Sequence, residues 1–77
     1  MTPAEQKAAL YAAVNRCDAM IVQAEVHDAH ERVDHQQDAR RIARYSARRT
    51  AIVGQRRGLE ALYVSLYGEN PWADIPF

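Results

Sequence analysis

Residues 28–38, with the sequence DAHERVDHQQD, decide which of two helical folds this chain adopts. Counting in alternate steps of three and four places an apolar seam before this stretch and another after it. Inside the stretch the same count meets only polar residues, namely Asp28, Glu31, His35 and Asp38. The stretch therefore either forms a turn between two helices or carries one helix through a polar segment.

The apolar positions on both sides of this stretch are predicted to pack helices together. A heptad spacing of this kind is typical of helix–helix seams. The predicted helix-packing residues are Leu10, Val14, Cys17, Ile21, Ile52, Leu59, Tyr63 and Leu66. Because the cysteine lies on the seam, we interpret it as a small buried side chain and not as a reactive thiol.

A long helical hairpin is the favoured fold, and the chain is predicted to be all-α. Helices are expected over about 3–27 and 38–67, which together form a helical domain over residues 1–67. Acidic side chains within a packed seam are costly, and this favours a turn. The alternative is one continuous helix in an oligomeric bundle, because neither glycine nor proline occurs between Ala4 and Val53.

The predicted helices carry start and stop signals. Thr2 and Glu5 have the spacing of a capping box around Pro3, which suits the first turn of a helix. Gly68 followed by Pro71 predicts the stop of the last helix.

Two residue pairs in the middle of the chain have similar capping-box-like spacing. They are Asp28 with Glu31 and Asp34 with Gln37, and either pair could start the second helix. In a hairpin, the acidic end of the first helix would then lie near the basic start of the second.

Gly54 and Gly58 interrupt the second apolar stretch, four residues apart on one helical face. They indicate a mildly flexible helix, a surface that another backbone approaches closely, or a bend that leaves a short final helix.

Charge is segregated along the chain although the net charge is zero. Acidic residues dominate 18–38, whereas 40–57 holds seven arginines and no acid. The partner-binding candidates in this segment are Arg40, Arg41, Arg44 and Arg48. On a helix these arginines could follow phosphates, with Tyr45 stacking on a base. They could equally face the acidic helix or an acidic protein surface, and the zero net charge weighs against free DNA binding.

The last ten residues, 68–77, are predicted to form an extended docking tail. Trp72, Ile75 and Phe77 are its anchors, and two prolines keep it extended. We expect these anchors to bind another subunit. The alternative is that the tail folds back over its own helices and completes a thin core.

No residue set predicts a reaction. The only metal-like cluster consists of His27, His30, Glu31, Asp34, His35 and Asp38. The first four lie at helical spacings of three and four, but the cluster does not match the zinc-protease signature. No glycine-bracketed serine and no glycine-rich phosphate loop occurs. The chain is therefore predicted to have no metal, no cofactor and no enzymatic activity.

The sequence also predicts where the protein is located. It has no basic leader followed by an apolar run, and no apolar run approaches the roughly 20 residues that span a bilayer. A single cysteine suits a reducing compartment. We expect a cytoplasmic protein, or a virion protein if a phage encodes it, with no membrane partner.

The opening of the chain, from Met1 to Leu10, resembles the start of small phage head–tail joining proteins of the W type. That family has a β-hairpin in its middle, whereas residues 25–45 are predicted to be helical here. The resemblance therefore covers the opening alone, and implies a small structural protein in a large assembly such as a virion.

These observations lead to two function hypotheses. The first is a non-enzymatic structural protein that acts through helix–helix and tail-mediated protein contacts, including self-association. The alternative is a nucleic-acid-binding or regulatory module. It would use the arginine-rich helix 40–57, or present the acidic stretch 18–38 as an inhibitor.

Overall fold

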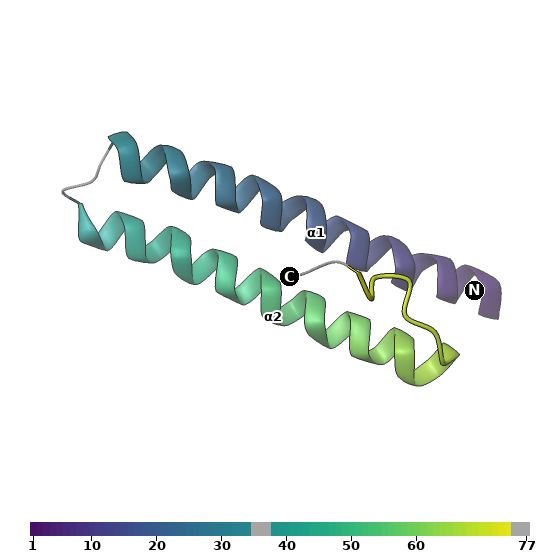
Figure 1. Cartoon of the computed structure of the whole chain (residues 1–77). Coiled ribbons are helices and arrows are strands. Elements are labelled where there is room, and N and C mark those ends of the chain that lie inside the picture. Colours follow the sequence, from purple (N-terminus) through teal and green to yellow (C-terminus); the bar gives the residue numbers. More distant parts are fainter. Residues whose placement is uncertain (35–37, 75–77) are drawn as a thin grey trace.

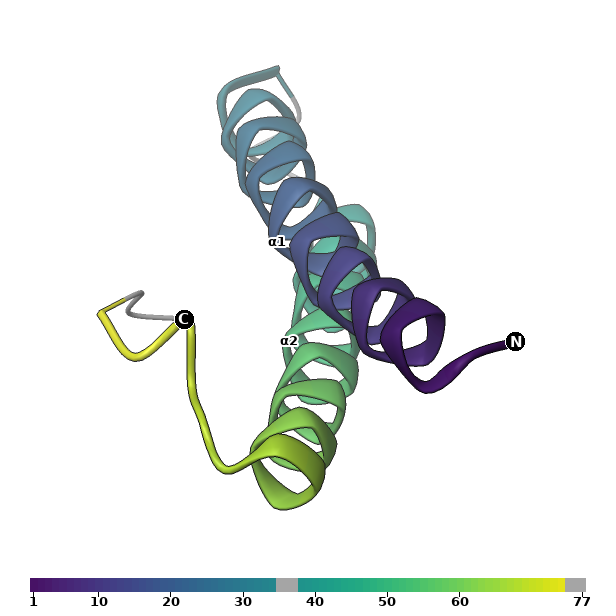
Figure 2. The ribbon, with the colours of Figure 1, turned by 90° about the vertical axis from the view of Figure 1, so that its right-hand side faces the viewer.

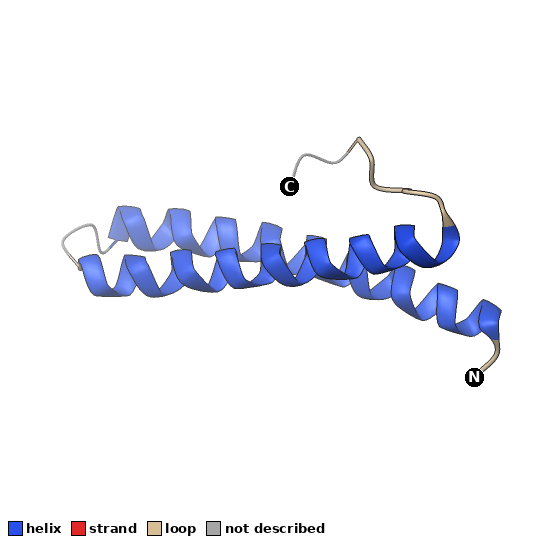
Figure 3. Cartoon of the chain, turned by 90° about the horizontal axis from the view of Figure 1, so that it is seen from below, coloured by secondary structure: helices blue, strands red, loops and turns tan. Residues whose placement is uncertain are grey.

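The chain folds into an antiparallel helical hairpin (Figure 1). The computed structural model describes residues 1–34 and 38–74, and in these ranges it contains two helices and no strand (Figure 3). Helix α1 spans Pro3–Asp34 and helix α2 spans Ala39–Tyr67. The all-α hairpin predicted from the sequence is confirmed, and the alternative of one continuous helix is wrong.

Both helices begin at capping interactions. Thr2 Oγ1 accepts a hydrogen bond from the Glu5 backbone N–H at 3.1 Å, and the Glu5 carboxylate accepts one from Thr2 N–H at 3.4 Å. This is the predicted capping box. In α2 the N-cap is Asp38, whose carboxylate accepts from Arg41 N–H at 3.0 Å. Each cap satisfies a backbone donor that the first helical turn cannot pair.

Helix α1 is longer than predicted. It passes the expected end near His27 and continues to Asp34, so neither Asp28 nor Asp34 begins the second helix. Gln37 lies outside the described residues. The reason is that the acids in the seam are compensated: Glu31 pairs with an arginine of α2 and Asp28 pairs with an arginine one turn later. An ion pair offsets part of the desolvation cost of a carboxylate, and that cost was the reason to expect an earlier turn.

Helix α2 ends where the sequence predicts and runs through its glycines without a break. Gly68 has φ 69°, and its N–H donates to Val64 O at 2.8 Å. That left-handed conformation favours glycine. A Cβ atom built on Gly54 or Gly58 would meet nothing within 4 Å. Of the three alternatives, the bend is therefore absent from α2, and no other part of the described chain approaches these glycines.

The core lies between the helices in two small clusters. The first contains Val14, Tyr63 and Trp72, with Leu10, Leu59 and Tyr67 packed against it. The second contains Cys17, Ile21 and Ile52, with Ala24, Val53 and Leu59 packed against it. Each of the predicted helix-packing residues except one belongs to these clusters.

Leu66 is the exception, because 60% of its surface is exposed. A straight α-helix drifts by about 20° per heptad relative to a strict seven-residue repeat. Towards the end of α2 the face that meets α1 has therefore moved away from Leu66. Tyr67 packs against the core in its place, with its ring 4.8 Å from that of Tyr63.

Candidate functional site

A series of ion pairs joins the acidic side of α1 to the basic side of α2. Glu31 meets Arg41 at 2.5 Å, and Glu25 meets Arg49 at 2.6 Å. The acidic part of α1 therefore lies beside the basic part of α2, as was expected for a hairpin. These ion pairs also engage the acidic stretch 18–38 inside its own hairpin, which leaves few free carboxylates for a partner to recognise.

The sequence did not single out the most buried ion-pair partner. Only 2% of Arg56 is exposed, and its guanidinium contacts the carboxylate of Asp18 at 2.6 Å and that of Glu60 one turn later. The sequence could have indicated it, because Arg56 falls on the same count of three and four as the apolar seam residues. An arginine buried at such a position needs a carboxylate partner. Arg56 therefore works as a polar part of the core.

From the end of α2 the tail turns back alongside the hairpin (Figure 2). Trp72, in this tail, is 97% buried. Its indole N–H donates to Asn15 Oδ1 at 2.9 Å. Its ring centroid lies 5.3 Å from that of Tyr11 and 5.0 Å from that of Tyr63. Within this chain Trp72 therefore packs against its own hairpin, which is the alternative that the sequence left open for the tail, and its contact with another subunit stays a prediction. The other two anchors, Ile75 and Phe77, lie outside the described residues.

Polar contacts fix the start of the tail as well. Lys7 Nζ lies 2.6 Å from Glu69 Oε1, and the Tyr63 hydroxyl donates to the same carboxylate oxygen at 3.1 Å. The hydrogen bond from Lys7, followed by that from Tyr63, lowers the pKa of Glu69. The hydrogen bond to Glu69 in turn raises the pKa of Lys7. Both shifts have their cause in the ion pair that joins Lys7 of α1 to the start of the tail.

We expect Glu69→Gln to lower the melting temperature at neutral pH and to have less effect in acid. A carboxylate whose pKa is lowered on folding contributes stability above its ordinary value of 4.5. That contribution is lost as the pH falls through the lowered value. The melting temperatures of Glu69→Gln and the parent should therefore converge between about pH 6 and about pH 3. Asp74→Asn, an exposed change in the same tail, is the control, and an equal loss at all pH values would contradict the assignment.

A second surface, the arginine ridge, is formed by Arg40, Arg44 and Arg48 at i, i+4 and i+8 on α2. All three side chains are exposed, and none forms an ion pair with any residue of 1–34 or 38–74. Arg41, predicted to act with them, is instead engaged by Glu31. Burial lowers the pKa of Arg41, but the carboxylate of Glu31 more than offsets this and leaves it raised.

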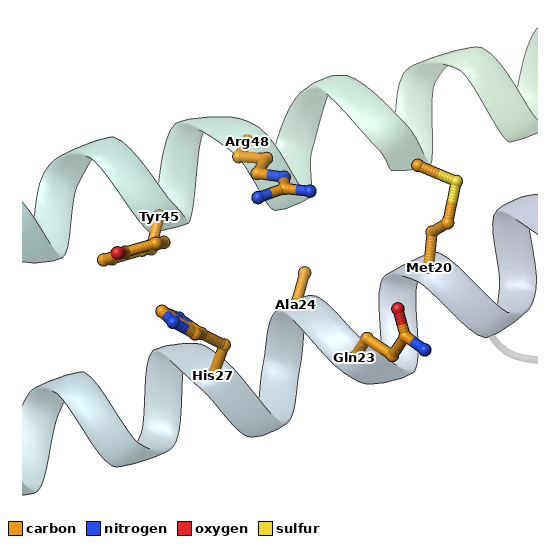
Figure 4. A pocket seen from close by; sticks show the side chains of 6 residues that line it. All are labelled: Met20, Gln23, Ala24, His27, Tyr45 and Arg48. Atoms are coloured by element: carbon orange, nitrogen blue, oxygen red, sulfur yellow. The ribbon is translucent and has the colours of Figure 1, made fainter.

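An open cleft lies between the helices beside this ridge. It has a volume of about 200 Å³ and is lined by Met20, Gln23, Ala24, His27, Tyr45 and Arg48. Figure 4 shows the rings of His27 and Tyr45 facing each other from opposite helices, and their centroids lie 4.2 Å apart. Tyr45 also lines a second hollow, together with Asp38, Arg40, Arg41 and Arg44. It thus stands where two neighbouring hollows meet.

A third surface is the apolar stripe on the outer side of α1. Val22, Val26 and Val33 are 51%, 54% and 75% exposed. Together with exposed Ala29 they follow the four, three, four spacing of a single helical face. The hairpin buries a different face of α1, which carries Val14, Cys17 and Ile21. Helix α1 is therefore apolar on two faces and packs only one of them within the described chain.

The histidines do not form a metal site with the acids near them. His27 packs on Tyr45 and Glu31 pairs with Arg41. Across residues 1–34 and 38–74, no group of three or more histidine, cysteine, aspartate or glutamate residues is placed to hold a metal ion. The candidate cluster of His27, His30, Glu31 and Asp34 is therefore not assembled.

Comparison with known proteins found no similar sequence or structure. No family model matches this sequence, and no curated protein or solved structure is significantly similar to it. Neither α1 nor α2, over the residues described, has an apolar stretch long enough to cross a bilayer.

Proposed function

We propose that this chain is a small non-enzymatic assembly protein that pairs with a second copy through the outer apolar stripe of α1. The observation that carries this proposal is the exposure of Val22, Val26 and Val33 on one face. A single hairpin buries few large apolar side chains, and small domains of this kind gain stability by association. A hairpin used in several copies would also suit a larger symmetric assembly such as a virion.

The spacing of the stripe is self-complementary, which favours a second copy as the occupant. In an antiparallel pair of α1 helices related by a twofold axis, Val22 faces Val33 of the second copy and Val26 faces Ala29. The same contacts then occur twice, as an isologous interface requires. The small side chain of Ala29 allows the two helices to approach closely opposite the larger valine. Such a pair would form an antiparallel four-helix arrangement with the two α2 helices outside.

The tail has a different role in this proposal from the one the sequence favoured. Trp72 supports the hairpin that presents the stripe, since its side chain closes the core at the open end. Assembly then depends on the tail through the stability of the folded hairpin and not through a direct contact of Trp72 with the second copy.

We expect Val26→Lys with Val33→Lys to convert an associated protein into a monomer, because Val26→Lys would bury a charge beside the twofold axis and Val33→Lys would add one at each end of the interface. Sedimentation equilibrium over a range of protein concentrations measures the change. Leu62→Lys is the matched control, since Leu62 is an exposed apolar residue of α2 that is 48% accessible. It should leave association unchanged. A parent protein that stays monomeric at all concentrations would contradict the proposal.

A further inference from the structure

We infer that the arginine ridge and the His27–Tyr45 ring pair form a binding site for single-stranded nucleic acid. The site would run along the N-terminal half of α2 and the cleft beside it. Phosphates would contact Arg40, Arg44 and Arg48, and an unpaired base would stack at the ring pair. The arginine ridge lies on α2 and the outer stripe lies on α1, and His27 borders the stripe because it lines a hollow together with Val22 and Val26. The binding site does not require the proposed assembly function.

The first step is the distribution of charge, which the zero net charge conceals. Within residues 1–34 and 38–74, eight of the ten acidic side chains of the sequence take part in ion pairs or helix caps, and the other two are Asp34 and Asp74. Those in ion pairs are Asp18, Glu25, Asp28, Glu31, Glu60 and Glu69, and those in caps are Glu5 and Asp38. The arginines without an ion pair in 1–34 and 38–74 are Arg16, Arg40, Arg44, Arg48 and Arg57. Three of these arginines share one ridge on α2, and the charge of that ridge is therefore basic although the whole chain is neutral.

The second step is the spacing of the ridge. Residues four apart on an α-helix are separated by roughly 6 Å along the axis. Arg40, Arg44 and Arg48 thus offer three guanidinium groups in a line along one side of α2. Arginine presents its donors in a planar fork that matches a phosphate group. Asp38 lies on the rim of the hollow, but its carboxylate is held by the N–H of Arg41 as the helix cap.

The third step is the aromatic pair, which favours nucleic acid over an acidic protein surface. Tyr45 lines both hollows, and the exposed His27 covers one side of its ring. Proteins that bind single strands combine a basic groove with rings on which bases stack. An acidic protein surface would use the arginines, whereas a base can in addition stack on the exposed ring pair. A base within a duplex is not free to stack on a side chain, so the rings indicate a single strand.

Fluorescence anisotropy with a labelled oligothymidylate of about 16 nucleotides tests the site. With three phosphate contacts, affinity should fall roughly twentyfold between about 50 and 200 mM salt. The triple variant Arg40→Ala, Arg44→Ala, Arg48→Ala should lose roughly a hundredfold in affinity at the lower salt and most of the salt dependence. Arg57→Ala is the matched control, because residue 57 lies nine positions beyond Arg48 and hence on the opposite side of α2. It should bind like the parent.

The stacking step is tested by Tyr45→Leu and Tyr45→Phe, with circular dichroism to verify that both variants stay helical. Loss of the ring should weaken binding by about fivefold or more, whereas phenylalanine should retain it. Polyglutamate of similar charge and a duplex of the same length serve as competitors. Equal binding of polyglutamate would overturn the site in favour of an acidic protein surface. Equal binding of the duplex, with no effect of Tyr45→Leu, would overturn the single-strand assignment. If the oligothymidylate did not bind even at low salt, both the arginine ridge as a phosphate site and the ring pair as a stacking site would be overturned.

Discussion

Arg56→Ala is expected to lower the free energy of unfolding by about 3 kcal/mol or more. The side chain is 2% exposed, and its removal leaves the carboxylates of Asp18 and Glu60 facing each other in a partly buried site. Removing one partner of a buried ion pair is costly because the remaining charges stay desolvated and uncompensated. Urea unfolding at a fixed protein concentration measures the change, since association alters the apparent stability.

Two controls separate the buried charge from a loss of helix propensity. Arg57→Ala makes the same chemical change at the neighbouring exposed position, and it should shift the free energy of unfolding by less than about 0.5 kcal/mol. Combining Arg56→Met with Asp18→Leu and Glu60→Leu removes all the charges together. Apolar replacement of a complete buried ion-pair group is often neutral or stabilising, so this variant should recover most of the loss. A destabilisation equal to that of Arg57→Ala would contradict the role of Arg56.

The hairpin could be predicted because the heptad count identifies the seam from side-chain type alone. Val14, Cys17, Ile21, Ile52 and Tyr63 are buried where the count places them. The end of α1 could not be predicted in the same way. An acid in a seam is costly when alone and acceptable when an arginine from another helix reaches it. That depends on the register between the helices, and the register becomes known only when both helices are placed.

The candidate surfaces were predictable only in part, for a related reason. The sequence indicates that Arg40, Arg41, Arg44 and Arg48 share a segment, but not which of them an acid of α1 neutralises. In the structure Arg41 is paired with Glu31, whereas the other three arginines form no ion pair with a described residue. The ring pair of His27 and Tyr45 joins residues from different helices, so no local spacing could reveal it.

The position of the tail also could not be predicted from the sequence, because it depends on how the two helices are placed. A substitution in the tail is expected to have the second large effect on stability. Trp72→Ala should lower the free energy of unfolding by about 3 kcal/mol or more, as truncation of a buried tryptophan does. The variant loses the ring contacts with Tyr11 and Tyr63, and the side chain of Asn15 loses the indole donor. Urea unfolding followed by circular dichroism measures the loss. Pro71→Ala, an exposed change next to it, is the control and should have little effect.

The role of Trp72 can be determined by measuring how the destabilisation by Trp72→Ala depends on protein concentration. If Trp72 closes the core of its own hairpin, the destabilisation by Trp72→Ala is the same at low and high protein concentration, and folded Trp72→Phe keeps the parental state of association. If Trp72 were an anchor on another subunit, the loss would appear only at concentrations where the parent associates. The hydrogen bond to Asn15 gives an independent check, since Asn15→Ala removes an acceptor of the same chain and should cost about 1 kcal/mol. Full parental stability in both Trp72→Ala and Asn15→Ala would show that the tail does not hold the hairpin together.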